Sequence, residues 1–222
     1  MTKAIILDTE TTRIENPEVI ELAYCSYDFA KPGVPTVVRF RPKEPCEFGA
    51  LAVHHILPGE LDGCQPSATA PSAVPPADYW IGHNIDFDWK ALGQPPVKRI
   101  CTLALARHIW PNVDSHSQSA LIYFLFGAIP ATRERLRNAH SAEADIALTL
   151  SILDAIVGLE GIEDFAELHQ LSEHARVPTK FTFGKFRGMP ISAADRGYAN
   201  WYARQSDPDP YMLEAFRRAR LL

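Results

Sequence analysis

The sequence predicts an α/β protein in which helices flank one mixed β-sheet and a small module of different character follows. Three observations support this fold class. Strand-like segments come first in the chain, segments with apolar residues at helical spacing follow them, and the pattern changes to short aromatic segments after Pro178. A chain of 222 residues is long enough for one large domain with a small appendage. We therefore expect a main domain over residues 1–175 and a small module over 176–222.

Apolar segments bounded by turn residues predict the strands of the sheet. They are Lys3–Leu7, Val19–Phe29, Thr36–Phe40 and Tyr79–Gly82. The first is rich in isoleucine and ends at Asp8, which is typical of a buried strand. The second and third follow at short spacing, so we expect an antiparallel meander that begins a mixed sheet.

Apolar residues at helical spacing predict the helices that cover the sheet. The segments are Phe48–Ile56, a short helix ending at Leu92, Thr102–Trp110, Ser117–Phe126, Ser141–Val157 and Ile162–Ala175. The stretch QPSATAPSAVPP at 65–76 predicts a surface loop with room for one helical turn. After Pro178, FTFGKFRGM predicts a β-hairpin around a Gly-Lys turn, and two helices at about 197–205 and 210–220 complete the small module.

The charges are unevenly distributed along the chain. Residues 176–222 contain nine lysines and arginines against four acids, a net charge of +5, whereas residues 1–175 contain 13 against 23, a net charge of −10. This asymmetry favours an acidic, metal-binding body with a basic attachment that can contact phosphates. The alternative is chance clustering of bases on a solvated helix face.

Composition excludes several other classes of protein. No apolar run approaches the roughly 20 residues that a membrane helix requires, and an acidic residue interrupts the first apolar stretch, so we expect a cytoplasmic protein without a signal peptide. The four cysteines do not have zinc-site spacing. We interpret them as reduced thiols, with Cys25 and Cys101 in the core and Cys46 and Cys64 in loops.

Asp8 and Glu10, in the segment ILDTETT, form the first candidate site. Residues two apart on a strand point to the same face of the sheet. Two carboxylates at the end of a buried strand repel each other and are stable there only if a cation neutralises them. Oxygen ligands alone favour Mg²⁺ or Mn²⁺ over zinc. A solvated strand end is the ordinary alternative for a single pair of this kind.

The segment HNIDFDW at 83–89 and the segment HSAEAD at 140–145 form two further candidate sites. In the first, Asn84 follows a strand and either Asp86 or Asp88 can take a functional role near a helix start, although acids there are commonly only dipole partners. In the second, Ser141 as N-cap would fix Asp145 in the first helical turn and leave His140 on the preceding loop. A fixed carboxylate can place an ion, and a movable imidazole can accept a proton from water.

Taken in order, these three motifs resemble the DEDDh family of 3′→5′ exonucleases, whose members have the ribonuclease H-like fold. The resemblance extends over residues 1–157. The segments ICTLALARHIWP at 100–111 and TKFTFGKFRGM at 179–189 are similar to the branch that contains bacterial exodeoxyribonuclease X, which extends the resemblance to nearly the whole chain. The FGKxxG segment identifies the branch and not the chemistry.

The resemblance implies a role for each matching residue. Asp8, Glu10, Asp88 and Asp145 would hold two Mg²⁺ ions, for which Mn²⁺ can substitute, and His140 would be the general base. Positions that would contact the 3′-terminal nucleotide are Thr11, Thr12, Arg13, His54 and Asn84. Arg13 and His55 replace glycines that are common in the family, which affects substrate preference rather than the metal ligands. Lys180, Lys185 and Arg187 of the basic module are candidate phosphate contacts.

Three functions remain open at this point. The first is a metal-dependent 3′→5′ exodeoxyribonuclease that releases 5′-mononucleotides, with DNA as its partner. The second is an exoribonuclease that trims RNA 3′ ends, because the same catalytic set acts on either phosphodiester. The third is a non-catalytic nucleic-acid-binding module, against which the intact set of acids argues. Protein partners are not predicted.

Overall fold

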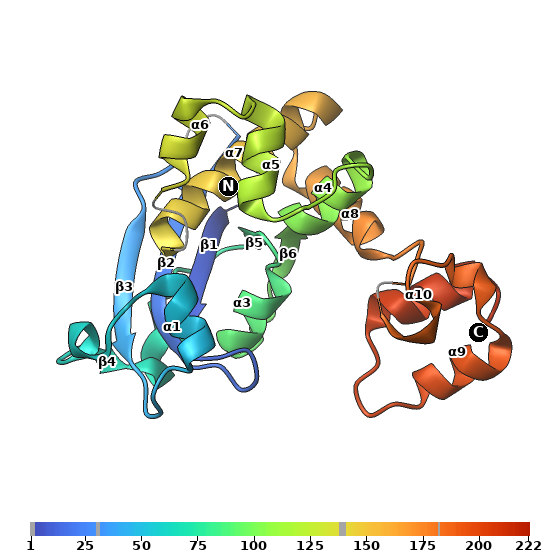
Figure 1. The fold of residues 1–222 in the computed structure, drawn as a ribbon, viewed down its shortest axis with the longest axis horizontal. Coiled ribbons are helices and arrows are strands. Elements are labelled where there is room, and N and C mark those ends of the chain that lie inside the picture. Colours follow the sequence, from blue (N-terminus) through green and yellow to red (C-terminus); the bar gives the residue numbers. More distant parts are fainter. Residues whose placement is uncertain (1–2, 30–31, 138–140, 182) are drawn as a thin grey trace. The chain divides into compact units, whose positions relative to one another are not determined.

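The structure is a computed structural model that describes residues 3–29, 32–137, 141–181 and 183–222 (Figure 1). Its internal contacts divide the chain into two compact units, Met1–Ser172 and Glu173–Leu222. The division lies a few residues before the predicted boundary. We describe each unit by itself.

A six-stranded mixed sheet forms the centre of the first unit. Its strands are β1 (Ala4–Thr11), β2 (Val19–Tyr27), β3 (Thr36–Arg41), β4 (Gln65–Pro66), β5 (Tyr79–Gly82) and β6 (Lys98–Cys101), in the spatial order β4-β3-β2-β1-β5-β6. The first three pair antiparallel, which confirms the predicted meander, while β5 runs parallel to both β1 and β6. The mixed sheet with flanking helices is the predicted fold class.

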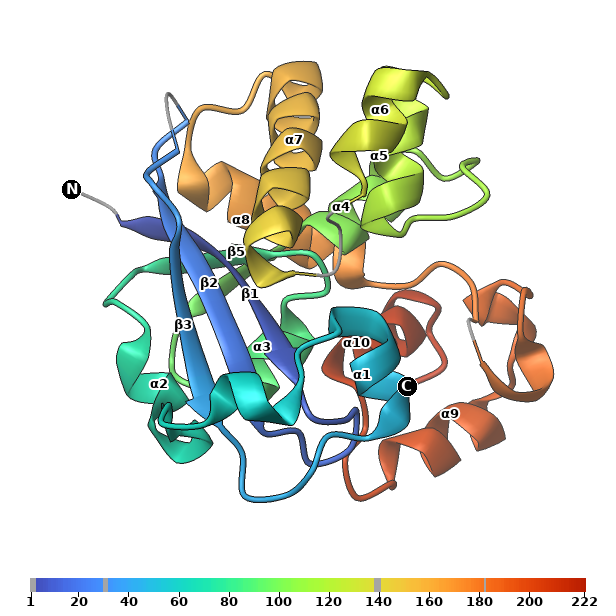
Figure 2. The same cartoon turned by 60° about the vertical axis from the view of Figure 1, so that its left-hand side comes forward.

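Eight helices of the described residues belong wholly or mostly to this unit. They are α1 (Phe48–His54), α2 (Ala70–Ala73), α3 (Asp86–Ala91), α4 (Thr102–Ile109), α5 (Gln118–Phe126), α6 (Pro130–Arg135), α7 (Ala142–Glu160) and α8 (Phe165–Arg176). The long helix α7 packs on β1 and β2, and α4 and α5 pack on α7 (Figure 2). Helix α3 follows β5 in the chain and contacts β1, the strand next to β5 in the sheet.

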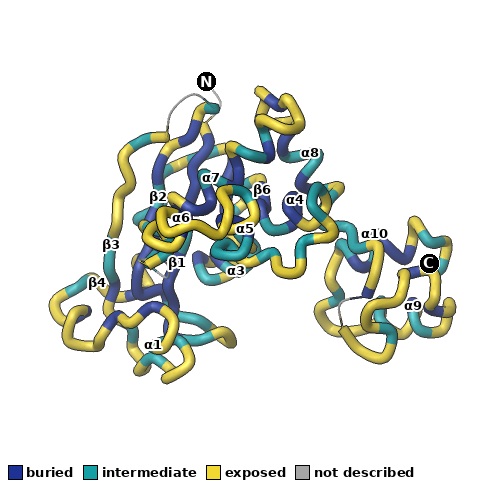
Figure 3. Tube along the Cα trace, turned by 45° about the horizontal axis from the view of Figure 1, so that its top comes forward, coloured by how far each residue is buried: buried dark blue, intermediate teal, exposed yellow. Residues whose placement is uncertain are grey.

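Burial is greatest where these elements meet. Residues of β1 and β2 are buried along almost their whole length (Figure 3), since helices cover the central strands of the sheet. Leu7, Leu22 and Ile81 are completely buried. The cysteines are all free thiols, with Cys25 and Cys101 buried as predicted.

Several elements differ from the prediction. Strand β1 continues to Thr11 rather than ending at Leu7, because its polar residues still pair with β2. Strand β6 and helix α6 were not predicted, since each is short and its apolar residues are too few to show a period. The predicted loop at 65–76 contains β4, a 3₁₀ turn at Ser67–Thr69 and the single turn α2.

The second unit consists of small turns and the helices α9 (Arg196–Ala203) and α10 (Pro210–Arg218). Among the described residues, the predicted β-hairpin is present in reduced form. Its two sides are joined by one isolated bridge between Lys180 and Pro190, by the Phe181 N–H bonded to the Met189 carbonyl at 2.9 Å and by the Gly188 N–H bonded to the Phe181 carbonyl at 2.8 Å, and a 3₁₀ turn at Gly184–Phe186 lies between them. Phe181 also packs into the apolar cluster with Phe216, so pairing and burial both hold this segment.

Among the described residues, we find no helix with both the length and the apolar character that a membrane crossing requires.

Candidate active site

Three carboxylates meet where α7 crosses the central strands. Asp8 and Glu10 come from β1, Asp145 comes from the first turn of α7, and one ligand oxygen of each lies within 4.8 Å of the others. Glu10 and Asp145 are buried and Asp8 is half-buried. The two strand residues face the same side, as their spacing predicts, and the packing of α7 brings the third acid to them. The arrangement is one that can hold a metal ion.

The start of α7 is fixed by hydrogen bonds on both sides. Ser141 is the N-cap, as predicted, and its Oγ accepts a hydrogen bond from the Ala144 N–H at 3.3 Å. The side-chain amide of Gln118, on α5, donates to the Asp145 carbonyl and to Thr149 Oγ1, both at 2.9 Å. Asp145 therefore projects from an anchored helical turn. His140 lies outside the described residues, and its role as general base stays a prediction.

The structure distinguishes Asp88 from Asp86, which the sequence left open. Asp88 is buried, and its Oδ1 accepts hydrogen bonds from the Thr9 N–H at 2.9 Å and from Thr9 Oγ1 at 2.7 Å. Asp86 instead pairs with Arg99, away from the three clustered acids. Thr9 lies between Asp8 and Glu10 in β1, so Asp88 is the acid of α3 that borders the site. It lies outside the trio whose oxygens approach within 4.8 Å.

The electrostatics of the site show that these acids are unfavourable without a counter-charge. Burial, and then the charges of Asp88 and Asp145, raise the pKa of Asp8 well above its usual value. Burial, followed by Asp145, raises the pKa of Glu10 to about 8. Burial also raises the pKa of Asp88 to about 7, although the hydrogen bonds from Thr9 oppose this shift. A bound cation would remove this repulsion, and a set of carboxylate oxygens suits a hard ion such as Mg²⁺ or Mn²⁺.

A further acid, Glu21, supports the site and was not predicted. It is the cross-strand partner of Glu10 and is almost completely buried. Its carboxylate accepts hydrogen bonds from Arg39 Nε at 2.8 Å and from the N–H of Ala142, the first residue of α7, at 3.2 Å. Glu21 thus connects two strands to the start of the helix that carries Asp145. The signal in the sequence is a charged residue inside the apolar strand VIELAY.

Replacing Glu21 with glutamine is expected to lower kcat about 10-fold with little change in KM, because the acceptor that holds Ala142 loses its charge and Asp145 becomes less firmly placed. Steady-state digestion of a labelled oligonucleotide measures this. Glu60→Gln is the matched control, since Glu60 also pairs with Arg39 but is not bonded to α7. Equal kcat values for the two variants would exclude a positioning role for Glu21.

A pocket of about 300 Å³ lies beside the acids, lined by residues from the end of β1, from α1 and from α3. Glu10 belongs both to this pocket and to the trio of clustered acids. Phe87 is partly buried and lines the pocket. The pocket has room for a small group next to the candidate metal site.

His54 is a buried polar residue of this pocket whose ring has one unpaired nitrogen. Its Nδ1 accepts a hydrogen bond from the Ile56 N–H at 2.9 Å, and burial lowers its pKa. The neutral ring therefore carries its proton on Nε2, which has no partner among the described residues. An unpaired buried N–H is costly, so His54 presents a donor that a ligand can satisfy. The following residue, His55, ends α1 at φ 57, a left-handed conformation that glycine adopts more readily than histidine.

The turn after β1 contains three of the predicted substrate contacts. Thr11 and Arg13 line the pocket, and the Arg13 guanidinium is held by the Pro45 carbonyl at 3.1 Å and by Glu47 at 3.9 Å. Thr12 is completely buried, and both its N–H and its hydroxyl oxygen bond to the backbone of Glu18. Thr12 therefore stabilises the turn itself. Arg13 has no positive φ, so this turn does not require a glycine at that position.

Two residues at the end of β5 have different roles. Asn84 is exposed and has φ 70, a left-handed conformation that asparagine tolerates, and it is not among the residues that line the pocket. The ring of His83 is bonded to Thr102 Oγ1 at 3.0 Å and to the His116 carbonyl at 2.9 Å, and burial lowers its pKa to about 4. His83 is thus committed to holding the loop after α4.

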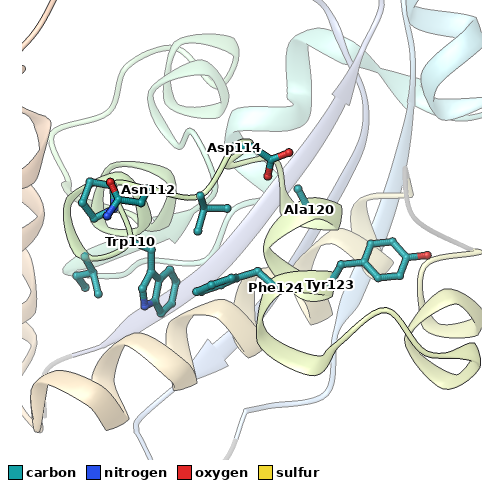
Figure 4. Close-up of a pocket in the computed structure, with 9 residues that line it drawn as sticks. Trp110, Asn112, Asp114, Ala120, Tyr123 and Phe124 are labelled. Carbon is teal, nitrogen blue, oxygen red and sulfur yellow. The ribbon is translucent and has the colours of Figure 1, made fainter.

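A larger pocket, of about 800 Å³, lies between the end of α4 and α5 (Figure 4). Its lining is mainly apolar, with the rings of Trp110 and Phe124 5.6 Å apart. It contains none of the predicted site residues. We therefore place the chemistry at the smaller, acidic pocket.

The predicted phosphate contacts belong to the second unit. Lys180, Lys185 and Arg187 are all exposed. Lys185 Nζ lies 4.7 Å from the ring centre of Phe186 and 5.3 Å from that of Tyr198. Their contact with phosphate stays a prediction.

Comparison with known proteins identifies relatives in sequence and in fold. No family model matches the chain. Exodeoxyribonuclease 10 of Escherichia coli strain K12 is 29% identical over 213 residues, which cover 91% of each protein. The solved structure of exonuclease X in complex with 5′ overhanging duplex DNA matches 76% of this chain and 99% of its own, with 24% identity and a TM-score of 0.61.

Escherichia coli exonuclease I in complex with a dT13 oligonucleotide also has a similar fold, with a TM-score of 0.58 and 18% identity. That match covers 71% of this chain and 41% of exonuclease I. The predicted resemblance to the exonuclease X type is confirmed, and so is the fold class, a mixed sheet flanked by helices that is consistent with the ribonuclease H-like fold.

Proposed function

We propose that this chain is a divalent-metal-dependent 3′→5′ exodeoxyribonuclease that releases 5′-mononucleotides from DNA ends. The observation that carries the proposal is the acidic trio of Asp8, Glu10 and Asp145, in which one carboxylate oxygen of each residue lies within 4.8 Å of the others. The similarity to exodeoxyribonuclease 10 over 91% of both chains supports the reaction class and DNA as the substrate. The four intact acids argue against a non-catalytic binding module.

The residues proposed to hold two Mg²⁺ ions are Asp8, Glu10, Asp88 and Asp145, and Mn²⁺ has the same ligand preference. Two such ions, when bound, would supply positive charge that stabilises the attacking and leaving oxygens of a phosphoryl displacement. The raised pKa values of Asp8, Glu10 and Asp88 support this assignment, because a cation offsets the repulsion that causes part of the shift.

The protein contributes rigid placement of these groups. Thr9 fixes the orientation of the Asp88 carboxylate through two hydrogen bonds, and Gln118 fixes the helical turn that carries Asp145. In the sequence, His140 immediately precedes Ser141, which is the N-cap of the helix that carries Asp145. We assign His140 as the general base that accepts a proton from the attacking water.

The pocket beside Glu10 is proposed to bind the 3′-terminal nucleotide. Its walls offer the Nε2–H of His54 as a hydrogen-bond donor, the Thr11 hydroxyl, and the anchored guanidinium of Arg13. Because Glu10 belongs to both the pocket and the acidic trio, a nucleotide bound there has its phosphodiester bond close to the proposed ions. Asn84, in the turn that leads into the helix of Asp88, is proposed to lie beside the 3′-terminal nucleotide.

A digestion panel tests the proposed function. Single-stranded, blunt and 3′-overhang DNA, and RNA of the same sequence, are incubated with the protein in Mg²⁺, in Mn²⁺ or in a chelator. We expect a 5′-labelled DNA to give a ladder of shortening products and a 3′-labelled DNA to release labelled mononucleotide at once. Digestion that survives chelation, or that occurs only with RNA, would contradict the proposal. Protein partners are not assigned, and a cytoplasmic location remains a prediction.

A further inference from the structure

The second unit exposes an aromatic surface that its own core does not require. Trp201 is 55% exposed and Phe183 is 41% exposed. Each rests on a partly buried tyrosine, with ring centres 5.4 Å apart for Tyr198 and Trp201 and 6.1 Å apart for Phe183 and Tyr202. We call these four residues the aromatic platform.

The platform is held in place by the core beneath it. Tyr198, Trp201 and Tyr202 are three and four residues apart on α9, a spacing that places them on neighbouring positions of one helix side. The two tyrosine rings pack against Phe216, which is completely buried. The apolar cluster of the unit is formed by other residues, so Trp201 and Phe183 present their rings to solvent on a fixed base.

The charge of the unit complements a polyanion. Glu173–Leu222 contains nine lysines and arginines and five acids, a net charge of +4. Four of the five acids are engaged locally. Asp195 and Asp209 cap α9 and α10, and Glu173 and Glu214 pair with arginines of the same unit.

Several lysines and arginines of the unit are, by contrast, exposed. In the residues that the structure describes, no ion pair involves Lys180, Lys185, Arg187 or Arg204. Lys185 lies over the rings of Tyr198 and Phe186, so a positive charge stands at the border of the platform. An exposed aromatic surface and a lysine that is in none of the ion pairs of the described residues therefore lie side by side.

We propose that the aromatic platform binds single-stranded DNA. Its nucleobases would stack on Trp201 and Phe183, and its phosphates would contact neighbouring lysine and arginine side chains of the unit. Flat rings beside positive charges recognise strands whose base faces are free, whereas a duplex keeps those faces stacked internally. The inference rests on the proposed function for the choice of DNA as the strand. It assigns to the basic unit a binding mode beyond phosphate contact.

Fluorescence anisotropy of a labelled 20-nucleotide DNA, measured with the full chain in a chelator, tests the proposal. Trp201→Ala and Phe183→Ala are each expected to weaken binding of the single strand about 5- to 100-fold, and Trp201→Phe is expected to restore most of it, because a ring remains for stacking. Binding of a blunt duplex is expected to change less than about 2-fold in these variants, since its base faces are not available.

Met189→Ala is the matched control, because Met189 is an equally exposed apolar side chain of the same unit, at 45%, that has no ring. Thermal melting checks that each variant is folded. Wild-type affinity for the single strand in both alanine variants would overturn the proposal and leave a protein partner as the occupant of the platform. An equal loss for single strand and duplex would also overturn it, because phosphate contact alone would then explain binding.

The two proposals can fail separately. If the protein digests DNA in Mg²⁺ but the platform variants bind single-stranded DNA like wild type, the proposed role of the platform is contradicted and the proposed exonuclease activity is not. If binding of single-stranded DNA depends on the platform but the protein shows no metal-dependent digestion, the proposed exonuclease activity is contradicted and the proposed role of the platform is not.

Discussion

Asp88→Asn is expected to lower the rate of oligonucleotide digestion by about 10²- to 10³-fold, whereas Asp86→Asn is expected to change it less than about 3-fold. The two acids are two residues apart on the same helix. Only Asp88 is buried beside the acidic trio, where its charge raises the pKa of Asp8. Asparagine keeps the acceptor oxygen for the hydrogen bonds from Thr9 but removes the negative charge that a cation requires.

The comparison is sharp because Asp86→Asn is a matched control in the same helical turn. Asp86 is engaged with Arg99 in a partly exposed pair, whose loss has little effect on stability. Initial rates over a Mg²⁺ titration measure both variants. Partial recovery of Asp88→Asn at high Mg²⁺ would fit a weakened metal site. Equal activity of both variants, or a larger loss for Asp86→Asn, would remove Asp88 from the metal ligands.

Asp8→Asn is expected to stabilise the metal-free protein at pH 9 by on the order of 1 to 3 kcal/mol in the free energy of unfolding, an increase of about 3 to 10 °C in Tm. The carboxyl of Asp8 is close to the charges of Asp88, Asp145 and Glu10, and removing its own charge relieves their repulsion. Thermal melting in a chelator measures the effect. The same substitution is expected to abolish the stabilisation that Mg²⁺ gives to the wild-type protein.

The pH dependence has a definite sign. In the folded protein the pKa of Glu10 is about 8 and that of Asp88 about 7, against ordinary values of 4.5 and 3.8. Between about pH 4 and pH 8 the folded state therefore binds more protons than the unfolded state, so the metal-free protein loses stability as pH rises through this window. At pH 5 the increase in the free energy of unfolding caused by Asp8→Asn is expected to be small.

Asp62→Asn is the control for this experiment, because Asp62 is an exposed carboxyl in a turn. Its Tm difference from wild type is expected to stay within about 1 °C at both pH values. If Asp8→Asn instead lowers the Tm at pH 9 in a chelator, the repulsion between the carboxylates is already offset without a metal, which contradicts the prediction.

Much of the site could be predicted from local patterns. The two-residue spacing of Asp8 and Glu10 places both on one side of a strand in any sheet, and Ser141 before an apolar helix is a strong N-cap. The meander of β1 to β3 follows from short connections between strand-like segments. These features depend on neighbours in the chain, which is why they could be predicted.

Other features had no local signal. The choice of Asp88 over Asp86 depends on Thr9, 79 residues earlier in the chain. The support from Glu21 depends on contact with Ala142, 121 residues later. The unpaired Nε2 of His54 exists because Ile56 occupies the other ring nitrogen in a buried turn. The reduction of the predicted hairpin to one isolated bridge likewise had no local signal, and neither did the packing of Phe181 against Phe216 of the helix α10.

The sequence by itself determined the α/β class, the order of the acidic motifs and the face on which each acid of a strand pair lies, because backbone periodicity and capping act over a few residues. Only the tertiary structure decided which acids share one pocket, which of them are anchored, and which rings of the second unit remain exposed. The physical reason is that distances between elements, and the burial that shifts a pKa, arise from the packing of α7 and α3 on β1, which no local pattern contains.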